Sequence, residues 1–229
     1  INAIDVHTGD VAWRVSEAGR FSAPPTFVRD RVIAVSGDPR SSRAQVLGID
    51  LYSGRTEWSR TLEAPPTARP LAHGKRITVP VGHGRRTTLI TLQAEDGSVV
   101  WTAPDPGLGI GGEALAIDRA LIVNAPNGTV TALDEDSGAQ RWQRKLSDPV
   151  ADDVPRRLEP VLRGGALFVP ASKVHVLRPK DGSSNGDALP CDLVPDLIRV
   201  DERGWVYIAE ESGHLEAYAP VAQLRLVKG

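Results

Sequence analysis

The sequence has no methionine and only one cysteine, Cys191, among its 229 residues. A single cysteine excludes an intrachain disulfide and the paired cysteines of CxxC metal and redox sites. No apolar run approaches the about 20 residues of a membrane-spanning helix, and aromatic residues make up only 5% of the chain. Because 27 Lys and Arg residues are balanced by 29 Asp and Glu residues, no net positive field favours a nucleic-acid partner. The composition is therefore that of an ordinary globular segment.

The sequence lacks the apolar periodicity of helices but contains a recurring motif. No stretch keeps an apolar period of 3.6 residues for three turns, while 22 glycines and 18 prolines favour turns. An eleven-residue motif recurs instead, with spacings of 45, 43, 41 and 44 residues between the central glycines Gly9, Gly54, Gly97, Gly138 and Gly182. The copies read AIDVHTGDVAW from Ala3, GIDLYSGRTEW from Gly48, TLQAEDGSVVW from Thr91, ALDEDSGAQRW from Ala132, a degenerate VLRPKDGSSNG from Val176, and a partial AYAPVAQLRLV from Ala217. Such a period is typical of β-propeller blades.

The segments between the motif copies supply the other strands of each blade. Apolar, β-branched stretches precede the copies at Arg31–Gly37, Arg76–Gly82, Ala120–Pro126, Ala166–Ser172 and Trp205–Glu211. Each follows another short strand and a tight polar turn. We therefore predict an all-β fold, a β-propeller of four-stranded antiparallel blades with strands a to d, in which the motif forms strand c, the c–d turn and strand d. One domain, 1–229, then holds a half blade at 1–17 and five full blades at 21–62, 63–104, 112–147, 156–188 and 193–228.

Each recurring position of the motif has a physical role. The third residue (Asp5, Asp50 and Asp134) and the Ser or Thr before the glycine are expected to accept backbone N–H groups in the turn. The glycine supplies a positive φ, and the small first residue is expected to let neighbouring sheets approach. Trp13, Trp58, Trp101 and Trp142 are expected to reach the neighbouring blade, where each indole N–H finds a carbonyl. We interpret these tryptophans as structural.

The motif resembles the tryptophan-docking repeat of PQQ-like β-propellers, whose consensus is close to A-x-D-x-x-T/S-G-x-x-x-W. The copies from Ala3 and from Ala132 match every named position. Members of this family commonly close with seven or eight blades, so the resemblance implies a larger ring with further residues upstream of Ile1. The family includes quinoprotein dehydrogenases, BamB-type outer-membrane assembly lipoproteins and sensor domains of membrane kinases, so the repeat predicts a fold rather than one function.

Catalytic signatures are missing from the sequence. The quinoprotein dehydrogenases hold PQQ beside vicinal cysteines and a calcium ion, and Cys191 alone cannot form that disulfide. The histidines show no H-x-x-x-H or H-E-x-x-H spacing, and we expect most of them to be solvated in turns or at strand starts: His7, His73, His83, His175 and His214. Neither a G-x-S-x-G nucleophile elbow nor a phosphate-binding G-x-x-x-x-G-K-S/T loop occurs. We therefore expect neither enzymatic activity nor bound PQQ.

The degenerate fifth motif copy contains a pattern that matches part of a calcium-loop template. Oxygen-bearing side chains follow one another at the spacing of that template, with Gly186 at its sixth position: Asp181, Ser183, Asn185, Asp187 and Asp192. A plain polar turn rich in Asp, Asn and Gly has the same composition. Both interpretations, a calcium site and an ordinary loop, stay open.

The b–c and d–a loops carry the irregular sequence of each blade, and they share one face of a propeller. The b–c loops of two consecutive blades contribute Arg40, Arg43, Arg85 and Arg86, and a later d–a loop contributes Asp148, Asp152 and Asp153. Charged, irregular loops on a rigid scaffold are suited to protein recognition. We therefore predict that a protein partner binds this face, although a solvated rim without a partner has the same charges.

The resemblance implies a non-catalytic protein-binding scaffold of the BamB type, in the periplasm or another extracytoplasmic compartment. An alternative is the extracytoplasmic ligand-sensing domain of a larger membrane-anchored protein. A remnant of a quinoprotein domain is a further alternative.

Overall fold

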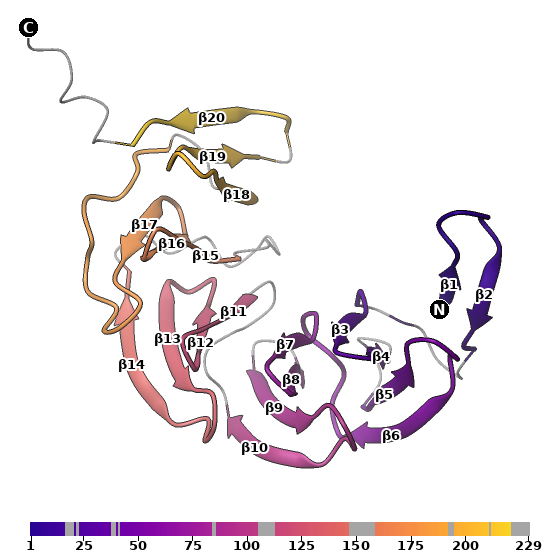
Figure 1. Cartoon of the computed structure of the whole chain (residues 1–229). Coiled ribbons are helices and arrows are strands. Elements are labelled where there is room, and N and C mark those ends of the chain that lie inside the picture. The colour runs from indigo at the N-terminus through magenta and orange to yellow at the C-terminus, as the bar shows by residue number, and fades with distance from the viewer. Residues whose placement is uncertain are drawn as a thin grey trace, which may run out of the picture. The chain divides into compact units, whose positions relative to one another are not determined.

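The computed structural model describes residues 1–16, 21, 23–37, 40, 42–83, 86–104, 113–146, 159–191, 195–210 and 212–220. Within these ranges every regular element is a β-strand, and all pairs of strands are antiparallel (Figure 1). No helix in these ranges has the length and hydropathy to cross a membrane. The chain divides into two compact units, Ile1–Pro106 and Gly107–Gly229.

The first unit contains three sheets in sequence order. A hairpin of β1 (Asn2–Ile4) and β2 (Val11–Arg14) precedes two four-stranded meanders. One meander has β3 (Thr26–Val28), β4 (Arg31–Ser36), β5 (Ala44–Asp50) and β6 (Thr56–Leu62). The other has β7 (Leu71–His73), β8 (Arg76–His83), β9 (Arg86–Gln93) and β10 (Val99–Pro104). The first strands of the two meanders, β3 and β7, lie side by side (Figure 1).

The second unit repeats the same plan. Its first sheet has β11 (Glu113–Ile117), β12 (Ala120–Asn124), β13 (Thr129–Asp134) and β14 (Gln140–Lys145). A three-stranded sheet follows, with β15 (Val161–Arg163), β16 (Ala166–Pro170) and β17 (Val174–Leu177). The last sheet has β18 (Leu197–Val200), β19 (Val206–Ala209) and β20 (Leu215–Tyr218). The outer strand expected at Gln223–Val227 lies outside the described residues.

The fifth predicted blade differs from the expectation of four regular strands. After β17 the chain returns along that strand but pairs with it only through two isolated bridges, Leu177 with Ser184 and Val174 with Leu189. This segment has lost the tryptophan of the motif, and its glycines Gly182 and Gly186 have φ of 69° and 128°. Positive φ interrupts the extended conformation that a strand ladder needs. The outer position of this sheet is therefore occupied without a regular strand.

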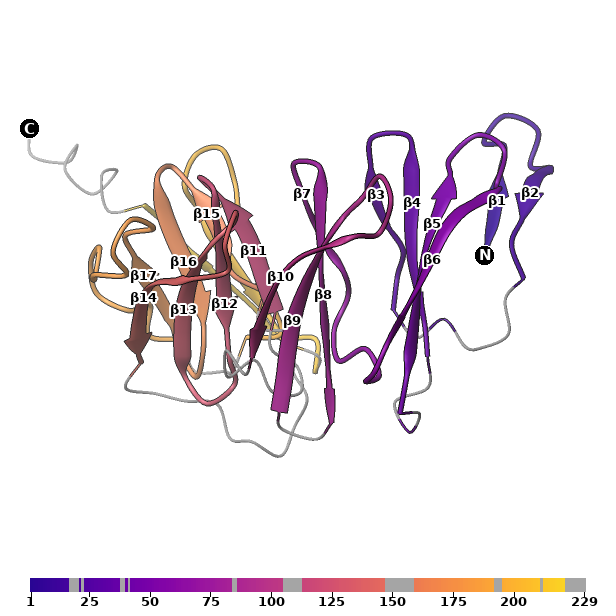
Figure 2. The ribbon, with the colours of Figure 1, turned by 90° about the horizontal axis from the view of Figure 1, so that it is seen from below.

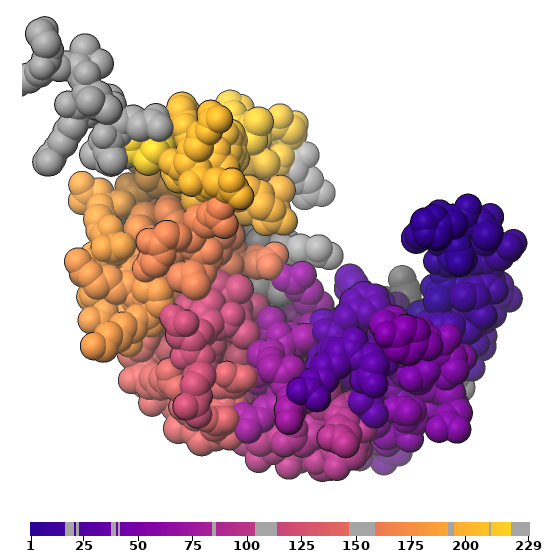
Figure 3. Space-filling model, in the orientation of Figure 1, coloured from indigo at the N-terminus to yellow at the C-terminus, as the bar shows by residue number. Residues whose placement is uncertain are grey.

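Both faces of the inner strands are covered, which explains their continuous apolar runs. In β4, Ile33 and Val35 face the core shared with the next sheet, while Val32 and Ala34 face the core shared with the first hairpin. All four side chains are at most 2% exposed. The space-filling view shows the first hairpin, in indigo, packed against the violet sheet that follows it (Figure 3). These strands do not alternate polar and apolar residues, because the side chains on both faces of each strand are covered by neighbouring sheets.

The tryptophans join consecutive sheets within each unit. The indole Nε1 of Trp13 donates to the carbonyl of Leu51 at 2.9 Å, and that of Trp58 donates to Ala94 at 3.0 Å. In the second unit Trp142 donates to the carbonyl of Pro179 at 3.0 Å. Each ring lies over the turn glycine of the following motif copy. A Cβ atom added there would lie 2.5 to 2.6 Å from the ring at Gly54, Gly97 and Gly182. Trp101 is buried as well.

The small first residue of the motif has a different role from the one expected. Gly48 pairs with Trp58 across β5 and β6, and Ala132 pairs with Trp142 in the same way, each pair being followed by a β-bulge. A Cβ atom on Gly48 would lie 2.2 Å from the Trp58 ring. The expectation that this residue lets neighbouring sheets approach is therefore corrected. It makes room for the tryptophan of its own sheet.

Substitution of Gly97 by alanine tests the docking of the tryptophan on the turn. The left-handed φ of +70° and the overlap with the Trp58 ring should together lower the free energy of unfolding by about 3 kcal/mol. Urea denaturation followed by tryptophan fluorescence measures the loss. Gly164→Ala is the matched control, because φ is +57° and no heavy atom lies within 4 Å of the added Cβ, so only about 1 kcal/mol should be lost. Equal losses would show that the ring does not constrain the turn.

Candidate functional site

The c–d turns are fixed by hydrogen bonds to one aspartate. Asp134 Oδ1 accepts the backbone N–H groups of Asp136 at 3.0 Å and Ser137 at 2.9 Å, and also the Ser137 hydroxyl at 2.8 Å. Its other oxygen, Oδ2, accepts Arg141 Nη2 at 2.7 Å. Asp5 and Asp50 accept turn N–H groups in the same way, which confirms the role predicted for the third motif position.

These hydrogen bonds favour the charged form of each carboxylate. The Arg141 guanidinium, the Ser137 hydroxyl and the Ser137 amide together hold the pKa of Asp134 well below its ordinary value of 3.8. The pKa of Asp50 is lowered by the hydroxyl and then the amide of Ser53. The charged carboxylates of these turns therefore act as hydrogen-bond acceptors that hold the backbone of the turn.

The predicted arginine face lies at the opposite ends of the strands in the first unit. Figure 2 shows the a–b and c–d turns of this unit along one edge and the b–c ends of β4, β5, β8 and β9 along the other. The b–c ends of the two meanders are joined by one segment. The carbonyl of Pro65 accepts the N–H of Gly82 at 2.9 Å, and the Pro66 ring lies against Gly37.

Two of the predicted arginines can be placed on this edge in detail. Arg43, just before β5, has a side chain that is 66% exposed, and its Nε lies 3.3 Å from the carboxylate of Glu63. Arg86 begins β9 and is exposed. Arg40 is also described, whereas Arg85, Asp148, Asp152 and Asp153 lie outside the described residues. Since Gly37 and Gly82 precede the two loops, the described arginines Arg43 and Arg86 stand on the same edge of the unit.

The predicted calcium loop forms a hydrogen-bonded turn in the structure. Asp181 Oδ1 accepts the amide and the hydroxyl of Ser183 at 2.9 and 2.6 Å, and these two bonds lower the pKa of Asp181. Arg178 Nη1 donates to the carbonyl of Ser184 at 2.6 Å. The described residues contain no cluster of three His, Cys, Asp or Glu side chains that could hold a metal. Asp192 lies outside the described residues, and the calcium site stays a prediction.

One histidine departs from the expectation of solvated rings. His73 is only 6% exposed, and its Nε2 lies 2.8 Å from the Thr78 hydroxyl, which in turn lies 2.6 Å from the Thr91 hydroxyl. The three side chains form a buried polar row across β7, β8 and β9. Burial of a polar group without a partner is costly. These hydrogen bonds therefore satisfy polar side chains that would otherwise be buried without partners in the sheet.

Two further docking residues were missed by sequence reasoning. Arg60 Nη1 donates to the carbonyl of Gly97 at 3.0 Å, and Arg144 Nη1 donates to Gly182 at 3.1 Å. Both arginines stand two positions after the motif tryptophan, next to the ring that covers the same glycine. The W-x-R pattern in two of the four complete copies was the signal available in the sequence.

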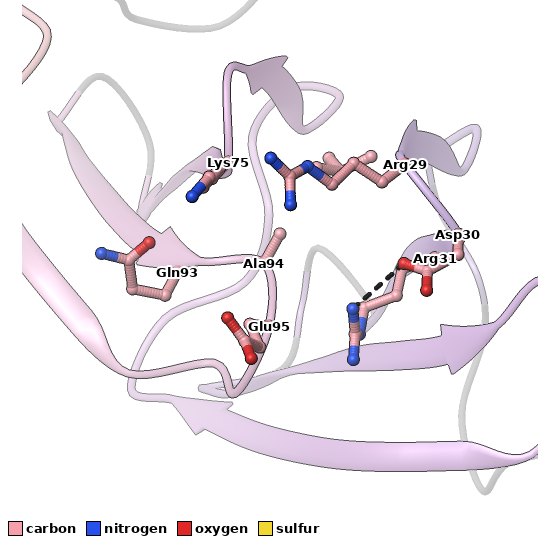
Figure 4. A pocket seen from close by; sticks show the side chains of 8 residues that line it. Arg29, Asp30, Arg31, Lys75, Gln93, Ala94 and Glu95 are labelled. Atoms are coloured by element: carbon pink, nitrogen blue, oxygen red, sulfur yellow. Dashed lines mark hydrogen bonds and ion pairs between the residues drawn. The ribbon is translucent and has the colours of Figure 1, made fainter.

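A recess of about 550 Å³ lies between the two meanders of the first unit, on the edge opposite the arginine face. It is lined by the β3–β4 turn, by Lys75 of the β7–β8 turn and by the start of the β9–β10 turn. Figure 4 shows the Arg29 and Lys75 side chains extending into the same space, with Glu95 nearby. Arg31, which also lines the recess, forms ion pairs with Asp30 at 3.2 Å and with Glu57 at 2.7 Å.

The second unit has a recess at the equivalent place, of about 440 Å³. Its lining includes the β11–β12 turn, Gly165 of the β15–β16 turn, and Pro179 and Lys180 after β17. The same elements therefore leave the same hollow between consecutive sheets in both units. The side chains differ, since Arg29, Lys75 and Glu95 are replaced by Asp118, Gly165 and Lys180.

The sequence of this chain matches a family model described as outer membrane protein assembly factor BamB, over residues 42–188. The chain belongs to the BamB-type family of PQQ-like repeat proteins. A curated member, the outer membrane protein assembly factor BamB of Yersinia pestis, is 27% identical over 158 residues. That match covers 64% of this chain and 39% of the relative, so the chain spans about two fifths of the relative's length.

Solved structures support the fold independently of this match. BamB from Moraxella catarrhalis superposes with a TM-score of 0.61 at 17% identity, over 93% of this chain and 80% of that one. A quinohemoprotein alcohol dehydrogenase from Comamonas testosteroni superposes with a TM-score of 0.63 at 14% identity, over 90% and 48%. At such identities the likeness shows the fold alone, and the fold is the all-β propeller architecture predicted from the repeat.

The charge on Asp134 predicts a pH dependence of stability. Because its pKa is lower in the folded chain, the carboxylate contributes stability above its ordinary pKa of 3.8, and this contribution is lost as the pH falls through the lower folded value. Asp134→Asn should therefore be less stable than the natural protein at pH 7, and the difference should shrink below about pH 4. Urea unfolding at pH 7, 4 and 2.5 measures it. Asp10→Asn, at an exposed position in the first turn, is the control, and a pH-independent difference for Asp134→Asn would contradict the mechanism.

Proposed function

We propose that this chain is part of a non-catalytic protein-binding scaffold that acts in the cell envelope, like the assembly factors whose family it shares. The observation that supports this most directly is the b–c edge of the first unit. There, exposed Arg43 and Arg86 stand on sheets whose inner strands are fully buried. Rigid sheets that hold charged, irregular loops give a partner a preorganised surface.

The same edge is suited to an acidic protein surface. Arg43 forms an exposed ion pair with Glu63, and such a pair stabilises a folded chain by little. A partner carboxylate can therefore replace Glu63 at small cost. Arginine is enriched in protein interfaces because its planar guanidinium binds carboxylates in a bidentate manner. We propose that Arg40 and Arg85, from the same two loops, extend this surface.

An oxidoreductase function has less support. The quinohemoprotein dehydrogenase resembles this chain in fold at 14% identity, which carries no argument about activity. The one cysteine, Cys191, is buried beside Val174 and Ile198. We propose accordingly that the chain serves binding, and that its envelope location follows that of the assembly factors.

Reversal of charge on the b–c edge tests the proposed scaffold role. The full-length protein with Arg43→Glu and Arg86→Glu should lose the envelope proteins that the natural protein captures, because two attractive charges become repulsive. Affinity capture from envelope extract with quantitative mass spectrometry measures the loss. Arg55→Glu with Arg203→Glu changes the charge equally on two turns outside the b–c loops and serves as the control. Unchanged capture by the first pair, or equal loss with the control pair, would contradict the proposal.

A further inference from the structure

Arg29 adopts a backbone conformation that its side chain disfavours. Its φ is 55°, in the left-handed region, which costs a residue with a Cβ roughly 1 to 2 kcal/mol. The same hairpin position holds Gly74 and Gly164 in two other sheets, each with φ of 57°, and Asp118 in a third. Glycine would remove the strain at Arg29. A strained arginine therefore points to a role of its side chain outside the hairpin.

No described residue forms a hydrogen bond or ion pair with the side chain of Arg29. The same holds for Lys75 and Glu95, which line the same recess. Figure 4 shows an interaction only between Arg31 and Asp30. Arg31 is paired with Asp30 and Glu57. The groups of the recess without a described partner are therefore two cations, Arg29 and Lys75, and one carboxylate, Glu95.

We propose that the recess between the β3–β4 and β7–β8 turns binds one carboxylate of an extended peptide from a partner protein, held between Arg29 and Lys75. The net charge of the unpaired groups matches a carboxylate monoanion, and Glu95 disfavours a dianion such as phosphate. A volume of about 550 Å³ exceeds what a carboxylate alone fills, since one water occupies about 30 Å³. The remaining space admits the neighbouring peptide backbone.

The equivalent recess in the second unit supports the assignment by contrast. It has similar dimensions and is formed by the same elements, yet Asp118 and Gly165 stand where the first recess has Arg29 and Lys75. Arg141 and Lys180 also line the second recess, but Arg141 is paired with Asp134 at 2.7 Å. Its groups without a described partner are therefore one cation, Lys180, and one carboxylate, Asp118, and we expect weaker carboxylate binding there. The geometry belongs to the repeat, whereas a pair of cations without a described partner, Arg29 and Lys75, lines only the first of these two recesses. This site lies on the edge opposite the arginine face and extends the proposed scaffold role to a second surface.

The experiment is a titration of the full-length protein with the peptide acetyl-Gly-Gly-Glu-Gly-Gly-amide, followed by amide chemical shifts in NMR. We expect saturable shifts at Arg29, Lys75 and Ala94, and a Kd about tenfold higher in Arg29→Gly and in Lys75→Gln, as for loss of one charge-assisted hydrogen bond. Glu95→Gln should lower the Kd, because a repulsive charge is removed. Arg29→Gly should also raise the melting temperature, because glycine relieves the strained φ, so its weaker binding cannot come from unfolding.

The controls separate the proposal from weaker explanations. Lys180→Gln, in the equivalent recess, should leave the Kd unchanged, and the peptide with Gln in place of Glu should not bind. Equal binding of the Gln peptide, or an equal effect of Lys180→Gln, would overturn the site. A Kd for acetate as low as that of the peptide would overturn the peptide assignment, and tighter binding of inorganic phosphate would overturn the carboxylate assignment. These outcomes are independent of the b–c edge, so failure here leaves the proposed scaffold role to its own test.

Discussion

The contact on which the rest of the structure depends is that of a motif tryptophan with the turn glycine of the next sheet. The indole N–H satisfies a carbonyl of that turn, and the absence of a Cβ leaves space for the ring. Each sheet is thereby fixed to its neighbour alone, so stability is a sum of nearest-neighbour terms within each unit. The fifth motif copy illustrates the dependence, because it has lost its tryptophan and the segment after β17 forms no regular outer strand.

The repeat made most of the fold predictable from the sequence. Period, strand content and the hydrogen bonds of Asp5, Asp50 and Asp134 are local properties that recur, so several copies report on the same geometry. The role of Gly48 was not predictable in this way, because it depends on which residue lies opposite across the sheet. The burial of His73 was missed for the same reason, since its partners Thr78 and Thr91 lie on two other strands.

The candidate sites were predictable by residue type but not by arrangement. The arginines of the b–c loops stand out in the sequence, yet the loops have no repeated pattern, and the segment at Pro65 and Pro66 that links the b–c ends of the two sheets has no counterpart in the motif. The recess with Arg29 has no sequence signature at all. Its lining comes from three turns of two sheets, and no single segment contains enough of it to form a motif.

Comparison of the two recesses shows which property comes from the fold and which from the side chains. The fold provides the hollow, and the lining side chains determine its charge. Packing of consecutive sheets leaves a hollow beside the β3–β4 turn and another beside the β11–β12 turn, although different residues line the two. A change of side chain at the hairpin then alters the chemistry without altering the sheets. Arg29 shows this at a measurable cost, since a left-handed arginine gives up roughly 1 to 2 kcal/mol of a total stability that is typically about 5 to 15 kcal/mol. Glycine occupies this position at Gly74 and Gly164, whereas Asp118 and Arg119 also adopt positive φ in the β11–β12 hairpin. The strain at Arg29 therefore supports a ligand only together with Lys75, which lines the same recess.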